Sequence, residues 1–179
     1  MVPMAFKNNQ RNRAPVRKGE TLATSPATVM TFLLVVLVLA GTGCRTVPPF
    51  AAVDFKDTAW KVEQGQAIWK PDRKNPEIAG DLTVARHPDG RTVAQFTKTP
   101  FPFVIAQTSS NAWQIEFVAF NRTLRAPGPA PGRIGWLHLV DCLDGSPPPN
   151  SWTFHRLADH QFRLENASSG ESLEGYLNP

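Results

Sequence analysis

The strongest constraint on the fold is a polar-apolar alternation of period two that starts at Trp60 and recurs toward the C-terminus. Leu82 and Val84 alternate with polar neighbours, and the same pattern runs from Trp113 to Ala119. Period two is typical of strands that bury one face, whereas helix-period runs of useful length are missing from the sequence. The pattern therefore predicts a mainly β, antiparallel domain.

Turn-forming residues divide this pattern into short strands. His87-Pro88-Asp89-Gly90 places proline and glycine at turn positions that they favour, and the stretch 108–111 supplies small polar side chains. We expect an antiparallel meander with strands at about 60–70, 80–87, 91–98, 102–108 and 111–120.

Two proline-rich segments interrupt the second half of the chain. Residues 126–132 hold alternating prolines and are expected to form a surface loop that joins neither a ladder nor a helix. Residues 144–150, with consecutive prolines, form the second break. The apolar stretch 134–140 between them fits either a short strand or a helical turn, and periodicity does not choose between the two.

Alternation returns at Trp152 and predicts two C-terminal hairpins, which turn near 158–159 and at 168–170. A flat sheet with one solvent-exposed face would leave the many large aromatic side chains of this domain poorly buried. Because curling covers apolar surface and removes exposed edges together, we expect the meander to curl into a half-open barrel with few short helices.

An apolar run at 31–40, TFLLVVLVLA, precedes the domain and follows a basic leader. The run is too short for a hydrocarbon core that needs about 20 apolar residues, but it suits a signal peptide, which needs about 7–15. The stretch 41–44, Gly-Thr-Gly-Cys, resembles the lipobox of bacterial lipoproteins, although Gly41 stands where leucine is usual. We expect cleavage before Cys44 and lipidation of that cysteine by diacylglycerol and palmitate; the alternatives are an ordinary signal cut near Ala40 or an uncut anchor.

The expected organisation is a signal peptide at 1–43, a flexible tether at 44–58 and a β-barrel-like domain at 59–179. Pro48 and Pro49 disfavour helix in the tether. In the enteric sorting rule, Asp directly after the lipidated cysteine retains a lipoprotein in the inner membrane. Arg45 does not match that signal, so we expect lipid anchoring at the periplasmic face of the outer membrane.

The formal charge of +4 lies entirely in the leader. Residues 1–43 hold five Lys and Arg against one Glu, so the remaining chain carries fourteen charges of each sign and is neutral. A phosphate-binding surface needs a basic patch or stripe. We therefore expect a membrane partner reached through the N-terminal lipid, and no nucleic-acid partner.

Catalytic motifs are missing from the sequence. A Gly-rich phosphate loop and a G-x-S-x-G elbow do not occur. Glu63, Asp81 and Glu116 occupy alternating strand positions that are typical of solvated faces. We expect no enzymatic activity and no cofactor.

Two other side-chain groups are candidates for a site. His155, Asp159 and His160 could meet across a hairpin as metal ligands, but such groups beside a turn are usually solvated, so we expect no metal site. Cys142 lacks a cysteine partner once Cys44 is lipidated, and no basic neighbour lowers its pKa. We expect a buried, unreactive thiol there.

The order of strands resembles a known family. The segment 60–69, WKVEQGQAIW, is followed by 80–84, GDLTV, and by a third strand after the hairpin. This order resembles the start of the LolA/LolB-like family of outer-membrane lipoprotein carriers and receptors. The resemblance implies a half-open β-barrel closed by helices, with an apolar cavity that takes lipoprotein acyl chains. The candidate acyl-binding residues are Trp69, Leu82, Val84, Phe96, Ile115, Phe117 and Trp152.

The resemblance also points to the stretch 99–103, TPFPF. In LolB-like receptors a hydrophobic residue on an exposed loop helps deliver the lipoprotein to the membrane, and Phe101 and Phe103 are the candidates here for a membrane or partner loop. The alternative is an edge strand bounded by prolines, with buried phenylalanines.

Two functions follow from these observations. The first is a lipid-anchored, periplasm-facing lipoprotein that binds an acyl chain or a lipoprotein in an apolar cavity, with a role in lipoprotein localisation. The second is a structural or interaction lipoprotein of the envelope with a filled core and no ligand. A small apolar β-shell is compatible with both.

Overall fold

The computed structural model describes residues 48–157 and 160–178, which form nine strands and three short helical segments. The predicted leader, Cys44, Arg45 and the turn at 158–159 lie outside the described residues. The elements are β1 (Lys61–Lys70), β2 (Ile78–Arg86), β3 (Thr92–Lys98), β4 (Phe101–Thr108), β5 (Ala112–Phe117), η1 (Val118–Phe120), β6 (Arg122–Pro127), η2 (Gly135–Leu137), α2 (Leu139–Leu143), β7 (Thr153–Arg156), β8 (Gln161–Glu165) and β9 (Ser172–Asn178).

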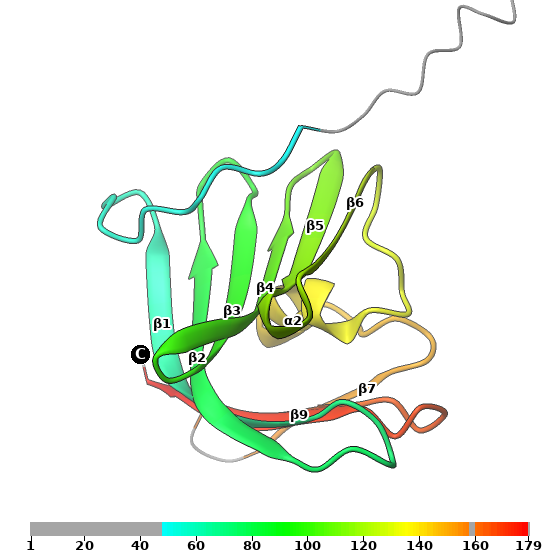
Figure 1. Ribbon diagram of the computed structural model, residues 1–179. Helices are drawn as coiled ribbons and strands as arrows, with labels where there is room; N and C mark the ends of the chain where they lie inside the picture. The colour runs from blue at the N-terminus through cyan, green and yellow to red at the C-terminus, as the bar shows by residue number, and fades with distance from the viewer. Residues whose placement is uncertain (1–47, 158–159, 179) are drawn as a thin grey trace, which may run out of the picture. The chain divides into compact units, whose positions relative to one another are not determined.

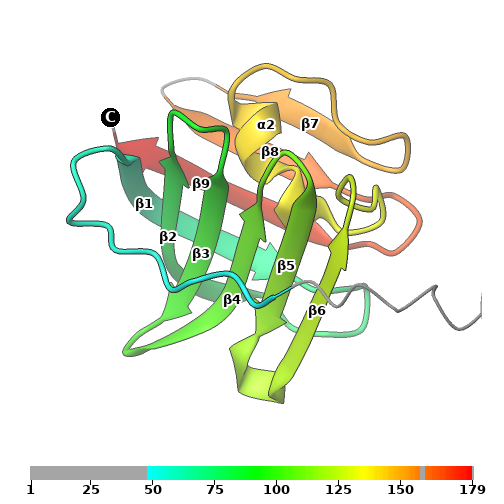
Figure 2. The same ribbon diagram turned by 90° about the horizontal axis from the view of Figure 1, so that it is seen from above.

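All the described strands belong to one antiparallel sheet in the order β6-β5-β4-β3-β2-β1-β9-β8-β7. Strand β1 pairs with β2 on one side and with β9 on the other, so the C-terminal hairpins join the meander at its first strand. The sheet bends around β1, which places β7 to β9 across from β3 to β6 (Figures 1 and 2). The predicted curled, half-open and mainly β architecture is confirmed.

The inner face of the sheet carries the apolar side of the alternation. One cross-strand row runs from Val84 through Ala94, Ala106 and Ile115 to Leu124. Each fully buried large apolar side chain of such a face contributes about 1.5–3 kcal/mol to folding. The period-two pattern read from the sequence is therefore the pattern of core burial.

The apolar stretch 134–140 is helical rather than extended. It forms η2 and the first part of α2, which lie inside the bend of the sheet between its two halves (Figure 2). Trp136 and Leu139 on these segments are buried in the same core cluster as the strands. The inside of the shell is thus filled by the chain's own side chains.

Two sequence-based expectations need correction. Ala126 and Pro127 were assigned to a surface loop, but they end β6 and pair with Trp113 and Ala112. Because β6 has β5 on one side and no strand partner among the described residues on the other, it tolerates a proline without an N–H.

The second correction concerns the alternative interpretation of 99–103 as part of an edge strand. Strand β4 lies inside the sheet, between β3 and β5. Its pairing with β5 starts only at Val104, and its pairing with β3 shifts register between Phe96 and Thr97. Pro102 precedes the part of β4 that pairs with β5, so its lack of an N–H removes no hydrogen bond between these two strands.

Residues 48–60 cross the outer face of the sheet from β5 toward β1 (Figures 1 and 2). The backbone N–H of Phe50 donates to Oε1 of Gln114 at 3.1 Å, and the Trp60 ring packs against His87 with centroids 5.0 Å apart. Ala85 and Gln114 are buried although they face outward. The expected tether therefore contacts the domain at Phe50, and Trp60, just after the expected tether, packs on the same face.

No helix within residues 48–157 and 160–178 has the length and apolar character that crossing a membrane requires.

Candidate functional site

The structure brings the seven candidate acyl-binding residues together in one core cluster. Trp69, Leu82, Val84, Phe96, Ile115 and Trp152 are buried, and Phe117 is half-buried against them. They come from β1, β2, β3 and β5 and from the residue before β7, all on the inner face. Six of the seven therefore lie on strands of the sheet and Trp152 lies just outside it, all in one core. The binding of an acyl chain by these residues stays a prediction.

Trp69 lies at the centre of this cluster. Its ring centroid is 5.6 Å from that of Trp136, 5.9 Å from Phe103, 6.3 Å from Phe96 and 6.4 Å from Phe117. Trp136 belongs to η2, so a helical segment occupies the space that the resemblance assigned to an acyl chain. The hollows described below are lined by other residues.

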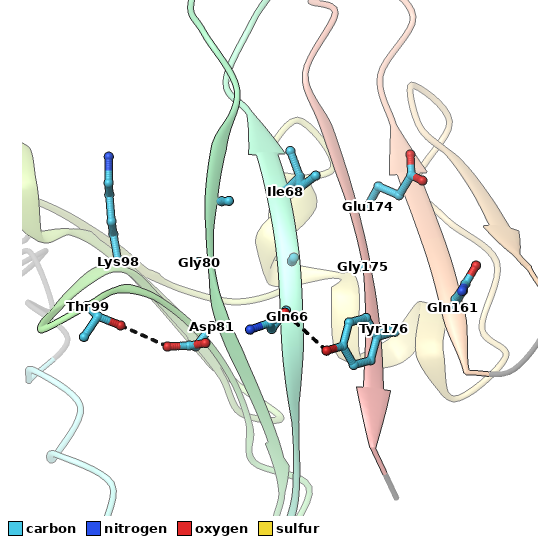
Figure 3. Close-up of a pocket in the computed structure, with 12 residues that line it drawn as sticks. Gln66, Ile68, Gly80, Asp81, Lys98, Thr99, Gln161, Glu174, Gly175 and Tyr176 are labelled. Carbon is cyan, nitrogen blue, oxygen red and sulfur yellow. Dashed lines mark hydrogen bonds between the residues drawn. The ribbon is translucent and has the colours of Figure 1, made fainter.

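The largest of these hollows, about 650 Å³, lies on the outer face over β9, β1 and β2 (Figure 3). Gln161, Tyr176, Gln66 and Asp81 are successive partners across four strands and form one row along it. Glu174, Ile68 and Ala79 form the next row. Lys98 and Thr99, at the β3–β4 turn, border the hollow on the β2 side. We call this feature the outer hollow.

Hydrogen bonds fix two side chains of the outer hollow. The Tyr176 hydroxyl donates to Oε1 of Gln66 at 3.2 Å, and the Thr99 hydroxyl donates to Oδ2 of Asp81 at 3.1 Å (Figure 3). Tyr176 as a whole remains 40% exposed. The polar atoms and the aromatic ring therefore face a common solvent-filled space.

Small residues lie between these two rows. Gly175, Ala67 and Gly80 are paired across β9, β1 and β2 and face inward. A Cβ on Gly80 would approach the Thr97 carbonyl oxygen to 2.5 Å and the Phe96 ring to 2.8 Å. The three small residues also line the outer hollow, so its floor between the two rows is strand backbone. Sequence reasoning missed this hollow, although mid-strand glycines are a signal of close approach.

A second feature is an apolar tip at one end of the meander, formed by residues 100–103, at the end of the β3–β4 turn and the start of β4, and by 118–120 of η1. Phe101 is 71% exposed and Phe120 is 67% exposed. Phe103 is half-buried, and its ring lies edge-on to Phe120, with centroids 6.0 Å apart. Lys98 and Arg122 flank the tip and are exposed. The sequence identified Phe101 and Phe103 but missed Phe120, because it read residues 111–120 as one strand.

A second hollow, about 610 Å³, lies where α2 ends beside β8 and β9. We call it the inner mouth. Leu143, Phe162 and Leu177 line it with apolar surface. Arg86 and Arg156 lie on its charged rim.

Arg86 joins the end of β2 to the end of α2. Its Nε lies 2.7 and 2.8 Å from the two carboxylate oxygens of Asp144, and its Nη1 lies 3.2 Å from Oε1 of Glu63. Glu63, expected to be solvated, is half-buried in this ion-pair network. Such a network orients the rim of the inner mouth.

The remaining candidates do not form a site among the described residues. His155 Nε2 lies 3.9 Å from Oε1 of Glu165, and Asp159 lies outside the described residues. Within the described ranges, no group of three or more His, Cys, Asp or Glu could hold a metal ion. Cys142 is 1% exposed, which confirms its predicted burial. Burial, with a smaller effect of Asp141, raises the pKa of its thiol to about 11.

A scan against protein-family models found no match to this chain, and a search of curated proteins found no significant match.

Proposed function

We propose that this chain is a lipid-anchored lipoprotein of the bacterial envelope whose β domain contacts a lipid surface through the apolar tip. The observation that carries the proposal is the exposure of two large aromatic side chains at the apolar tip, Phe101 (71% exposed) and Phe120 (67% exposed). Phe120 also lies edge-on to Phe103, with ring centroids 6.0 Å apart. Exposed large aromatic side chains grouped at one end of a domain are typical of interaction surfaces.

The chemistry of the apolar tip favours a membrane as the partner. Phenylalanine rings bury into the boundary between headgroups and acyl chains, while nearby basic side chains attract anionic lipids. Lys98 and Arg122 supply those charges on both sides of the tip. Lipidation at Cys44 would hold the domain at the same surface, and we expect that surface to be the periplasmic face of the outer membrane.

Vesicle binding tests this proposal. The chain from residue 44 onward, carrying Cys44→Ser, should sediment with vesicles of phosphatidylethanolamine and phosphatidylglycerol. Replacing Phe101 and Phe120 with Asp should reduce the bound fraction at least about tenfold, because it removes apolar burial and adds like charge.

The control is Leu157→Asp, which places one such charge on an exposed apolar side chain directly after β7, to be compared also with the single variant Phe101→Asp. The Leu157 variant should bind vesicles as the parent protein does. Equal binding by all these proteins, or loss of binding only in the Leu157 variant, would refute the role of the tip.

A second candidate function is the binding of an acyl chain, as the family resemblance implies. The observation that favours it is the inner mouth, whose apolar lining lies beside Arg86 and Arg156. Arg86 is paired with Asp144 and Glu63, so Arg156 is the basic group that would bind the head of an anionic amphiphile. Entry further into the shell would require η2 and α2 to move away from Trp69.

Displacement of a fluorescent fatty acid by a lipidated peptide tests this second function. Arg156→Glu should weaken fatty-acid binding about tenfold because it reverses the charge at the rim. Arg125→Glu reverses the same charge at an exposed residue of β6 and should leave the affinity for the fatty acid unchanged. Absence of probe binding at micromolar concentration would reject acyl-chain binding.

A further inference from the structure

We propose that the outer hollow is a binding site for a short neutral saccharide. This inference concerns a different face of the sheet from the apolar tip and does not depend on lipid binding. Its volume of about 650 Å³ falls within the range of about 300–1,000 Å³ that is usual for small-molecule sites.

The position of the outer hollow determines how a ligand is recognised there. Strands β9, β1 and β2 each have hydrogen-bonded neighbours on both sides. Along the hollow, β9 and β1 are paired on both sides, and residues 78–80 of β2 pair with β1 but not with β3. Most backbone N–H and C=O groups here are therefore engaged in the ladders, and three residues are too short a stretch for a peptide to bind by adding a strand. Recognition has to use side chains.

The side chains of the polar row provide mixed donors and acceptors. Gln66 and Gln161 carry amide groups that donate through nitrogen and accept through oxygen, Asp81 accepts, and Thr99 does both. Sugar hydroxyl groups also donate and accept at the same atom, so this set matches them. Gln66 uses its oxygen to hold Tyr176, which leaves its amide N–H groups directed to other partners.

Tyr176 supplies the apolar part of the site. Its hydroxyl is held by Gln66, which fixes the ring without covering it. The C–H face of a pyranose packs against such a ring by dispersion and by contact with its electron-rich face. Ile68, which is 47% exposed in the neighbouring row, extends this apolar surface.

The charges around the outer hollow favour a neutral ligand. Lys98 is its single basic lining residue, whereas Asp81 and Glu174 are acidic. Nη1 of Arg163 lies 3.6 Å from Glu174, which offsets one of the acids. A phosphorylated or polyanionic ligand needs several convergent basic groups, and the described lining does not supply them.

The sequence offers a direct probe, because Tyr176 is the only tyrosine in the chain. The full-length protein, labelled with ¹³C at tyrosine and purified in detergent micelles, should give one set of ring signals. Titration with chitotriose and with cellotriose should shift these signals for at least one of the two sugars, with a Kd of about 1 mM or tighter.

Three variants test the roles of the side chains. Tyr176→Ala should weaken binding at least about tenfold by isothermal titration calorimetry, while Tyr176→Phe should keep most of the affinity because the ring remains. Gln161→Ala, at an exposed position whose loss leaves the core intact, should weaken binding several-fold. Leu157→Ala, exposed outside the hollow, should leave binding unchanged.

The proposal is overturned if neither trisaccharide shifts the tyrosine signals at about ten times that Kd. It is also overturned if the folded Gln161→Ala and Tyr176→Ala proteins, checked by circular dichroism, bind with parental affinity. A shift caused by inorganic phosphate alone would assign the hollow to anions and refute the neutral-ligand proposal. The role of the apolar tip is tested separately, by vesicle binding, so the two proposals can fail independently.

Discussion

The indole N–H of Trp69 donates a hydrogen bond of 3.2 Å to Oε1 of Glu171, which links the end of β1 to the turn before β9. Burial, with a smaller effect of Asp72, raises the pKa of the Glu171 carboxyl to about 7, and the bond from Trp69 only partly opposes this rise. The centre of the aromatic core is thus connected to a group that titrates near neutral pH.

Glu171 should make folding stability depend on pH. Because its folded pKa of about 7 exceeds the ordinary value of 4.5, the folded state holds the proton more tightly than the unfolded chain. The stabilisation is full below the ordinary value and is lost as pH rises through 7. We expect a decrease of as much as about 3 kcal/mol in the free energy of unfolding between pH 4.5 and 8.

Urea denaturation at both pH values measures this effect. Glu171→Gln should remove most of the decrease, because a neutral amide does not titrate. Glu174→Gln, an exposed change on β9, should leave the decrease in place. An unchanged pH dependence in Glu171→Gln would contradict the assignment.

Leu139 tests whether the helical segment fills the shell. It is fully buried on α2, so Leu139→Ala should lower the free energy of unfolding by about 2–5 kcal/mol. Leu157→Ala, at an exposed position, should change it by less than about 0.5 kcal/mol. Chemical denaturation provides the measurement, and equal small effects would show that α2 does not pack into the core.

Cys142 should be unreactive in the folded protein. Its burial and its pKa of about 11 keep the thiolate, the reacting form, scarce at pH 8. In the Cys44→Ser protein, a disulfide reagent should react with Cys142 at least about 100-fold more slowly in buffer than in urea. Rapid reaction without denaturant would mean that α2 leaves the core readily.

Local sequence signals predicted the meander well. The turn at His87–Gly90 and the alternation around Leu82 and Trp113 depend on neighbours close in the chain, so β1 to β5 were expected within a few residues of their observed bounds. The segment 134–140 was ambiguous because a short apolar run has no decisive period. Its helical state is accompanied by packing of Trp136 against Trp69, a contact between distant parts of the chain.

Alternation alone determined which side chains face the core, because in a strand each residue points to the face opposite its neighbour's. Six of the seven candidate acyl-binding residues that the family resemblance implied lie on strands and face the core in this way. Tertiary structure decided what lies against that face, since the position of η2 and α2 follows from packing. It also decided the outer hollow: Gln66 and Tyr176, 110 residues apart, meet only because β9 returns to pair with β1 in this register.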